Sequence, residues 1–139
     1  MDKIFEDEFM DVQAGLVSLC LETIENNADR IYVYCSIEEK SQSFNACFRC
    51  GGEVKTLNQM GIPMRRMVQF LRTGSGDLQK VRDVCANYGK PVPTEMKMVY
   101  DVQMGKFESK YRYEEICSAK TQKAASEVFD EWVEEIRRE

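Results

Sequence analysis

Two of the six cysteines have the spacing of a metal or redox motif. Cys47 and Cys50 form a CxxC that is followed by Gly51-Gly52. A zinc ribbon needs two such pairs to supply four thiolates, and this chain has one pair and no histidine. A redox CxxC needs its first cysteine at a helix start, where the thiolate is stabilised. The surrounding residues favour a strand, on which positions i and i+3 point to opposite faces. We therefore interpret both as strand cysteines and keep a small metal- or redox-dependent module as an alternative.

Catalytic chemistry is restricted by the lack of histidine. Ser-His-Asp triads, Cys-His pairs and His-ligated metal sites are all excluded. Carboxylates could still act as general acids or bases, and four of them lie near a predicted hairpin: Asp101, Glu108, Glu114 and Glu115. Their spacing gives no reason for them to share a cleft. We expect no catalytic residue, no metal site and no cofactor, and hence a protein that is not an enzyme.

The charge is distributed unevenly over the 139 residues. The net charge is −5, and residues 1–11 and 127–139 each carry −4, which leaves +3 for the middle. A protein that binds free nucleic acid neutralises phosphates with a positive surface, so nucleic acid is not the expected partner. No apolar run approaches the roughly 20 residues that span a bilayer, and the acidic N-terminus does not resemble a signal peptide. We expect a cytoplasmic protein with reduced cysteines and no membrane partner.

The periodicity of apolar residues predicts the elements that must position any site. Three-to-four spacing indicates helices, and alternation indicates strands. The predicted helices cover residues 3–26, 64–71, 77–88 and 118–138, with residues 73–76 interrupting the middle pair. The predicted strands cover residues 30–37, 43–50, 53–57, 94–100 and 106–113. In the first strand, Ile31, Val33 and Cys35 share one face, while Tyr32 and Tyr34 share the other.

This order of elements predicts an α+β fold. Short hairpin turns imply antiparallel pairing, and the strict strand–helix alternation of a doubly wound sheet is missing. We expect residues 1–139 to form a single domain with one antiparallel sheet of about five strands. The N-terminal, middle and C-terminal helices are expected to pack mainly on one face of that sheet.

The C-terminal helix carries the candidate binding residues. Its acidic side chains recur at three- and four-residue steps, opposite an apolar stripe that includes Phe129, Trp132 and Ile136. Such a face is solvated by default, and it is also the best candidate for a negatively charged docking surface. The predicted partner-binding residues are Glu127, Asp130, Glu131, Glu134 and Glu135.

The second half of the chain resembles a known family. The run from Pro93 to Asp101, then Gly105-Lys106-Phe107, then the run from Tyr111 to Glu114, is similar to the hairpin of the YezG-like immunity proteins. The aromatic-rich early strands, the Gly51-Gly52 turn and the helix with Trp132 also resemble that family. The similarity covers roughly residues 4–135.

The resemblance implies a bacterial antitoxin. Such a protein binds the toxin domain of a polymorphic or contact-delivered toxin, often a nuclease, and blocks it by stoichiometric occlusion inside the producing cell. An acidic surface would steer such a protein onto a basic toxin. A non-catalytic scaffold or dimerisation protein is the further alternative, and the sequence leaves open whether the protein is a monomer or a dimer.

Overall fold

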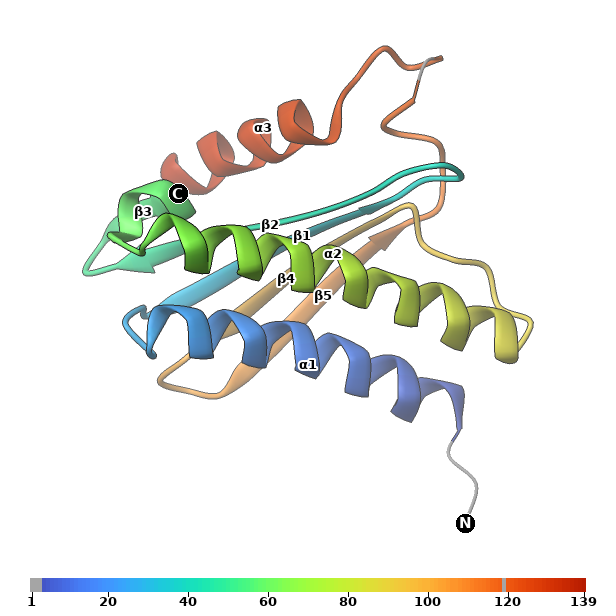
Figure 1. Ribbon diagram of the computed structural model, residues 1–139, viewed down its shortest axis with the longest axis horizontal. Coiled ribbons are helices and arrows are strands. Elements are labelled where there is room, and N and C mark those ends of the chain that lie inside the picture. Colours follow the sequence, from blue (N-terminus) through green and yellow to red (C-terminus); the bar gives the residue numbers. More distant parts are fainter. Residues whose placement is uncertain (1–3, 119) are drawn as a thin grey trace.

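The fold is one five-stranded antiparallel sheet with helices on both sides. The computed structural model describes residues 4–118 and 120–139. The strand order is β3-β2-β1-β4-β5, and the helices flank the sheet as drawn in Figure 1. The elements are α1 (Phe5–Ile24), β1 (Arg30–Ile37), β2 (Gln42–Cys50), β3 (Glu53–Thr56), η1 (Leu57–Met60), α2 (Met64–Asn87), β4 (Glu95–Asp101), β5 (Lys106–Arg112) and α3 (Ala125–Arg137). The predicted α+β class and the five-stranded antiparallel sheet are confirmed.

Strand β1 lies at the centre of the sheet, so both of its faces are buried. It pairs with β2 on one side and with β4 on the other, and Tyr32 lies opposite Cys47 in β2 and Val99 in β4. The predicted turn at Gly51-Gly52 joins β2 to β3, with φ values of +58° and +87°. Only glycine adopts such backbone angles at little cost. Successive side chains of β1 point to opposite faces of the sheet, so each face needs helices to cover its own set of β1 side chains.

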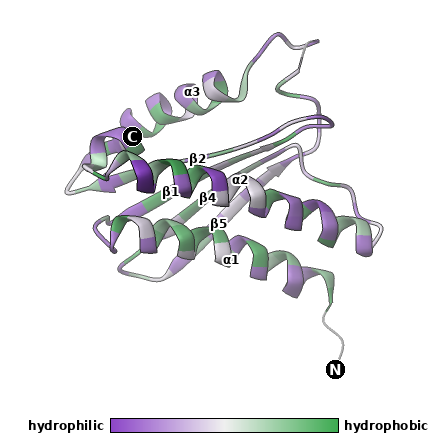
Figure 2. Cartoon of the chain, in the orientation of Figure 1, coloured by the Kyte–Doolittle hydropathy of each residue, from purple (hydrophilic) through white to green (hydrophobic). Residues whose placement is uncertain are grey.

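Helices α1 and α2 cover the face that carries Ile31, Val33 and Cys35. These side chains join Leu16 of α1 and Leu78 of α2 in one buried cluster. Figure 2 shows hydrophilic and hydrophobic residues following each other along both helices, as expected where one side of a helix packs and the other faces water. The predicted division of β1 into two faces is confirmed.

Helix α3 covers the opposite face. There, Tyr32 and Tyr34 of β1 belong to a second buried cluster with Phe129 and Trp132 of α3. The helices were expected mainly on one face, and α1 and α2 do share one. The third helix lies on the other because the two tyrosines of the central strand must also be removed from water. Burying an aromatic side chain contributes about 1.5–3 kcal/mol.

The predicted break at residues 73–76 does not exist. Helix α2 runs without interruption from Met64 to Asn87. Gly74 lies against the ring of Phe44 in β2, and a β-carbon there would come within 2.1 Å of the Phe44 Cδ1 atom. This glycine therefore allows close packing of the helix on the sheet and does not end the helix.

The last helix is shorter than predicted. It begins at Ala125 rather than at residue 118, and residue 119 lies outside the described part of the chain. Gln122 has a φ of +57°, which an α-helix cannot accommodate. The Thr121 hydroxyl donates to the Ile116 carbonyl at 2.7 Å, so the segment before α3 is a turn held by side chains.

Candidate partner-binding surface

The acidic helix is docked on the sheet by its apolar stripe. Trp132 packs edge-on against Tyr32, with ring centroids 6.0 Å apart, and lies 6.2 Å from Tyr34. The ring of Phe129 packs against that of Tyr34, with the ring centroids 6.1 Å apart. Arg137 donates to the backbone carbonyl of Val54 and ties the end of the helix to β3. The packing leaves the other side of α3 free to face solvent.

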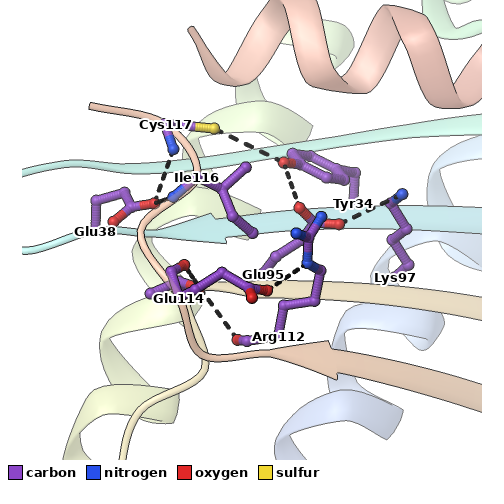
Figure 3. Close-up of polar contacts among 9 residues, drawn as sticks. Tyr34, Glu38, Glu95, Lys97, Arg112, Glu114, Ile116 and Cys117 are labelled. Atoms are coloured by element: carbon purple, nitrogen blue, oxygen red, sulfur yellow. Dashed lines mark hydrogen bonds and ion pairs between the residues drawn. The ribbon is translucent and has the colours of Figure 1, made fainter. Parts of the chain in front are cut away.

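The segment that leads into α3 is held by a buried carboxylate. Glu38, the residue directly after β1, is 9% exposed. Its Oε1 accepts hydrogen bonds from the backbone N–H groups of Ile116 and Cys117 at 3.1 and 3.0 Å, as Figure 3 shows. Charged acceptors form stronger hydrogen bonds than neutral ones. Glu38 therefore sets where the chain crosses to the α3 face.

All five predicted binding residues are exposed on the outer side of α3: Glu127, Asp130, Glu131, Glu134 and Glu135. We call them the acidic ridge. Two of them have basic neighbours, since Glu131 pairs with Lys123 at 3.3 Å and Glu134 pairs with Arg137 at 2.9 Å. Within residues 4–118 and 120–139, the other three have no ion pair. The ridge thus keeps three carboxylates whose charge is not offset by a contact.

A groove runs beside the acidic ridge, between α3 and the sheet. It has a volume of about 310 Å³, and we call it the α3 groove. Trp132, Glu135 and Glu139 line its helix side, and Lys97 and Lys110 lie on its sheet side. Lys97 also stands 5.5 Å from the centroid of the Trp132 ring, in a cation–π contact. The groove therefore has an acidic helix side, whereas its sheet side carries both signs of charge, with Glu108 beside the two lysines.

A buried polar cluster lies at one end of the same sheet face. Glu95 is 1% exposed, and its carboxylate accepts from the Tyr34 hydroxyl at 3.5 Å and pairs with Lys97 at 3.4 Å. Figure 3 shows these groups converging from β1 and β4. Burial, followed by the negative charge of Glu95, raises the pKa of Tyr34. Tyr34 therefore stays protonated and can donate to Glu95.

The CxxC cysteines do not converge. Cys47 lies in the cluster under α3, whereas Cys50 packs against the cluster under α1 and α2. Burial raises the pKa of the Cys47 thiol to about 12 and also raises that of Cys50, so neither favours the reactive thiolate. The metal alternative requires both sulfurs to bind one ion, and the redox alternative requires them to bond to each other. Side chains on opposite faces of one strand do neither.

The four carboxylates considered for acid–base chemistry do not form one site. Asp101 pairs with Arg30 at 3.5 Å, Glu108 with Lys106 at 3.7 Å and Glu114 with Arg112 at 2.6 Å. A backbone hydrogen bond from Met104, with a further contribution from Arg30, lowers the pKa of Asp101. Glu115 is exposed. Over the described residues, no group of three or more Cys, Asp or Glu side chains is arranged to hold a metal ion.

The sequence analysis missed the residues that shape the surface around the ridge. Glu38 and Glu95 were not considered, and Lys97 and Lys110 were not connected with α3. A signal was present, because Lys97 and Val99 alternate with buried methionines and so belong on the face opposite α1. The position of α3 on that face depends on contacts between β1 and α3 in the second buried cluster. The residue pattern of a single strand does not reveal such contacts.

Comparison with models of known protein families found no match, and a search of curated proteins also found none. In the described part of the chain, no helix is both long and apolar enough to cross a membrane.

Proposed function

We propose that this protein is an immunity protein that binds a cognate bacterial toxin domain and blocks it by stoichiometric occlusion. The observation that carries the proposal is the acidic ridge, in which five carboxylates lie on the exposed side of one docked helix. The resemblance of the hairpin around Gly105-Lys106-Phe107 to YezG-like immunity proteins supports the same role.

The position of the ridge suits a rigid binding surface. Its side chains take no part in the apolar packing under α3, so a partner can contact them without disturbing the core. A negative surface accelerates encounter with a positive one and covers a site meant for nucleic acid. The toxin that fits best is therefore basic, such as a nuclease, and the protein itself needs no catalytic group.

The first experiment tests the partner. The protein and the product of the adjacent gene are produced separately and together, and growth and complex formation are measured. We expect the neighbour to arrest growth alone, growth to return on co-production, and the two proteins to co-purify in a 1:1 complex. A neighbour that is not toxic, or that does not associate, would refute the proposal. A stable dimer with no partner would favour the scaffold alternative.

A second experiment tests the ridge within that complex. The double reversal Glu127→Lys with Asp130→Lys is expected to slow association about tenfold at low salt, with a smaller effect at high salt. The control reverses two exposed acids on the helices of the opposite face, Glu22→Lys in α1 with Asp83→Lys in α2. It changes the net charge by the same amount. Equal slowing by both pairs would mean that net charge, and not the ridge, guides binding.

A further inference from the structure

Strand β5 forms an open edge of the sheet. It is the last strand in the order and pairs with β4 along seven residues, from Lys106 to Arg112. Across the described ranges, no strand pairs with its outer side. An open edge presents backbone N–H and C=O groups that can pair with an extended segment of another chain. Figure 1 shows β5 at the margin of the sheet.

Two grooves flank this edge, one on each face of the sheet. On the α1 side, a mostly apolar groove of about 230 Å³ is lined by Met10, Leu21, Tyr100 and Phe107, among others, and we call it the α1 groove. On the other side lies the α3 groove, to which β5 contributes Glu108 and Lys110. Because side chains alternate along a strand, a strand added outside β5 would direct successive side chains toward one groove and then the other.

The charges on β5 define the chemistry of such a strand. Lys110 lies directly opposite Lys97 in the register of β4 and β5, and like charges in this arrangement are unfavourable. Lys97 has a partner in Glu95, whereas Lys110 has no ion pair in the part of the chain that the structure describes. An acidic side chain next to Lys110 would relieve the repulsion. Charged residues on an edge also discourage unselective pairing.

We propose that β5 accepts an extended segment of the partner as a sixth strand of the sheet. In this segment, apolar side chains face the α1 groove, and an acidic side chain faces Lys110. The other charged residues of β5 already have partners, since Lys106 pairs with Glu108 and Arg112 pairs with Glu114. A matching segment would place a base beside Glu108 and acids beside Lys106 and Arg112. The proposal deepens the function proposed above, because the segment would belong to the toxin.

The test uses the protein alone with a synthetic heptapeptide, acetyl-EVEVKVE-amide. In antiparallel pairing, its glutamates lie beside Arg112, Lys110 and Lys106, and its lysine lies beside Glu108. The control peptide, acetyl-KVKVEVK-amide, reverses every charge and keeps the valines. We expect amide NMR shifts and slowed hydrogen exchange confined to β5 and its flanks, with binding of the first peptide at least about tenfold stronger.

Variants locate the effect. Lys110→Glu should weaken binding of the first peptide about tenfold, while Lys40→Glu, an equal change in an exposed turn outside the sheet, should not. Equal binding of both peptides, shifts centred away from β5, or no effect of Lys110→Glu would overturn the proposal. A dimer of the free protein with protected β5 amides would also overturn it, since the occupant would then be a second copy.

The outcomes separate this inference from the proposed function. Toxin binding by a protein that ignores both peptides would remove the strand site and leave the immunity role standing. Selective peptide binding by a protein with no toxic neighbour would leave the strand site standing and remove the immunity role.

Discussion

Two buried glutamates on the α3 side of the sheet differ in how their charge is satisfied. Glu38 accepts two backbone hydrogen bonds from the segment before α3. Glu95 depends on side chains, with the Tyr34 hydroxyl at 3.5 Å and the Lys97 ammonium at 3.4 Å. Glu38 therefore holds the backbone of the segment before α3 directly, whereas Glu95 contacts only other side chains. Its removal would leave two N–H groups without their acceptor.

At the scale of this residue, Glu38→Ala is expected to lower the free energy of unfolding by about 2–3 kcal/mol, because hydrogen bonds to a charged acceptor are lost in a buried site. Glu38→Gln keeps a carbonyl oxygen and should cost less. The control is Glu39→Ala, which changes an exposed neighbour and should stay within about 0.5 kcal/mol. Urea denaturation measures all three. Similar losses for Glu38→Ala and Glu39→Ala would show that the hydrogen bonds of Glu38 to Ile116 and Cys117 contribute nothing.

At the scale of elements, α2 shows how a local signal is overridden by packing. Two glycines and two hydroxyl residues in sequence are typical of a connector, yet the helix passes through them. The Phe44 ring fills the space where a Gly74 side chain would be, and Phe44 is itself buried and packs against Phe70 with centroids 5.1 Å apart. The ring therefore has little freedom to move aside.

The two glycines of α2 should respond to alanine in opposite directions. Gly74→Ala is expected to destabilise the protein by about 1–3 kcal/mol, because the new methyl group overlaps the Phe44 ring. Gly76 has no atom within 4 Å of an added β-carbon, so Gly76→Ala should stabilise by about 0.5–1 kcal/mol through higher helix propensity. Thermal and urea unfolding test both. A gain in stability from Gly74→Ala would contradict the close contact.

At the scale of the whole molecule, the two faces of the sheet are covered unequally. Two long helices lie on one face and a single short helix lies on the other, near β2 and β3 (Figure 1). The residues of β4 and β5 on that second face remain partly open and form the floor of the α3 groove. Because α3 lies near β2 and β3, this asymmetry leaves the α3 groove open between the helix and the β4 and β5 end of the sheet.

Substitution of the single tryptophan, Trp132, should show how much the packing of α3 on the sheet contributes to stability. Trp132→Ala is expected to reduce the free energy of unfolding by about 3–5 kcal/mol, because it leaves a cavity against Tyr32 and Tyr34. Trp132→Phe keeps an aromatic ring and should cost about 1–2 kcal/mol. Circular dichroism follows both in urea. A loss below about 1 kcal/mol for the alanine variant would be incompatible with the docked helix.

Much of the fold could be predicted because its signals are local. Alternation placed the strands within one or two residues and divided β1 into two faces, and helical spacing predicted that the acids of α3 lie opposite Trp132. Two predictions were wrong, the break in α2 and the early start of the last helix. Gly74 serves the packing of α2 against Phe44 and does not end the helix, and the positive φ of Gln122 delays the start of α3. The exposed position of the acidic ridge is confirmed, and its binding role stays a prediction.

The sequence by itself determined the type and order of the elements, the antiparallel hairpins and the amphipathic character of α3, since these follow from spacings of two to four residues. Only the tertiary structure decided that α3 lies on the face away from α1, that Lys97 and Lys110 line the groove beside it, and that β5 is left at the edge. Those features depend on contacts between residues far apart in the chain, whose free energies are summed over the whole core and leave no periodic trace in any one segment.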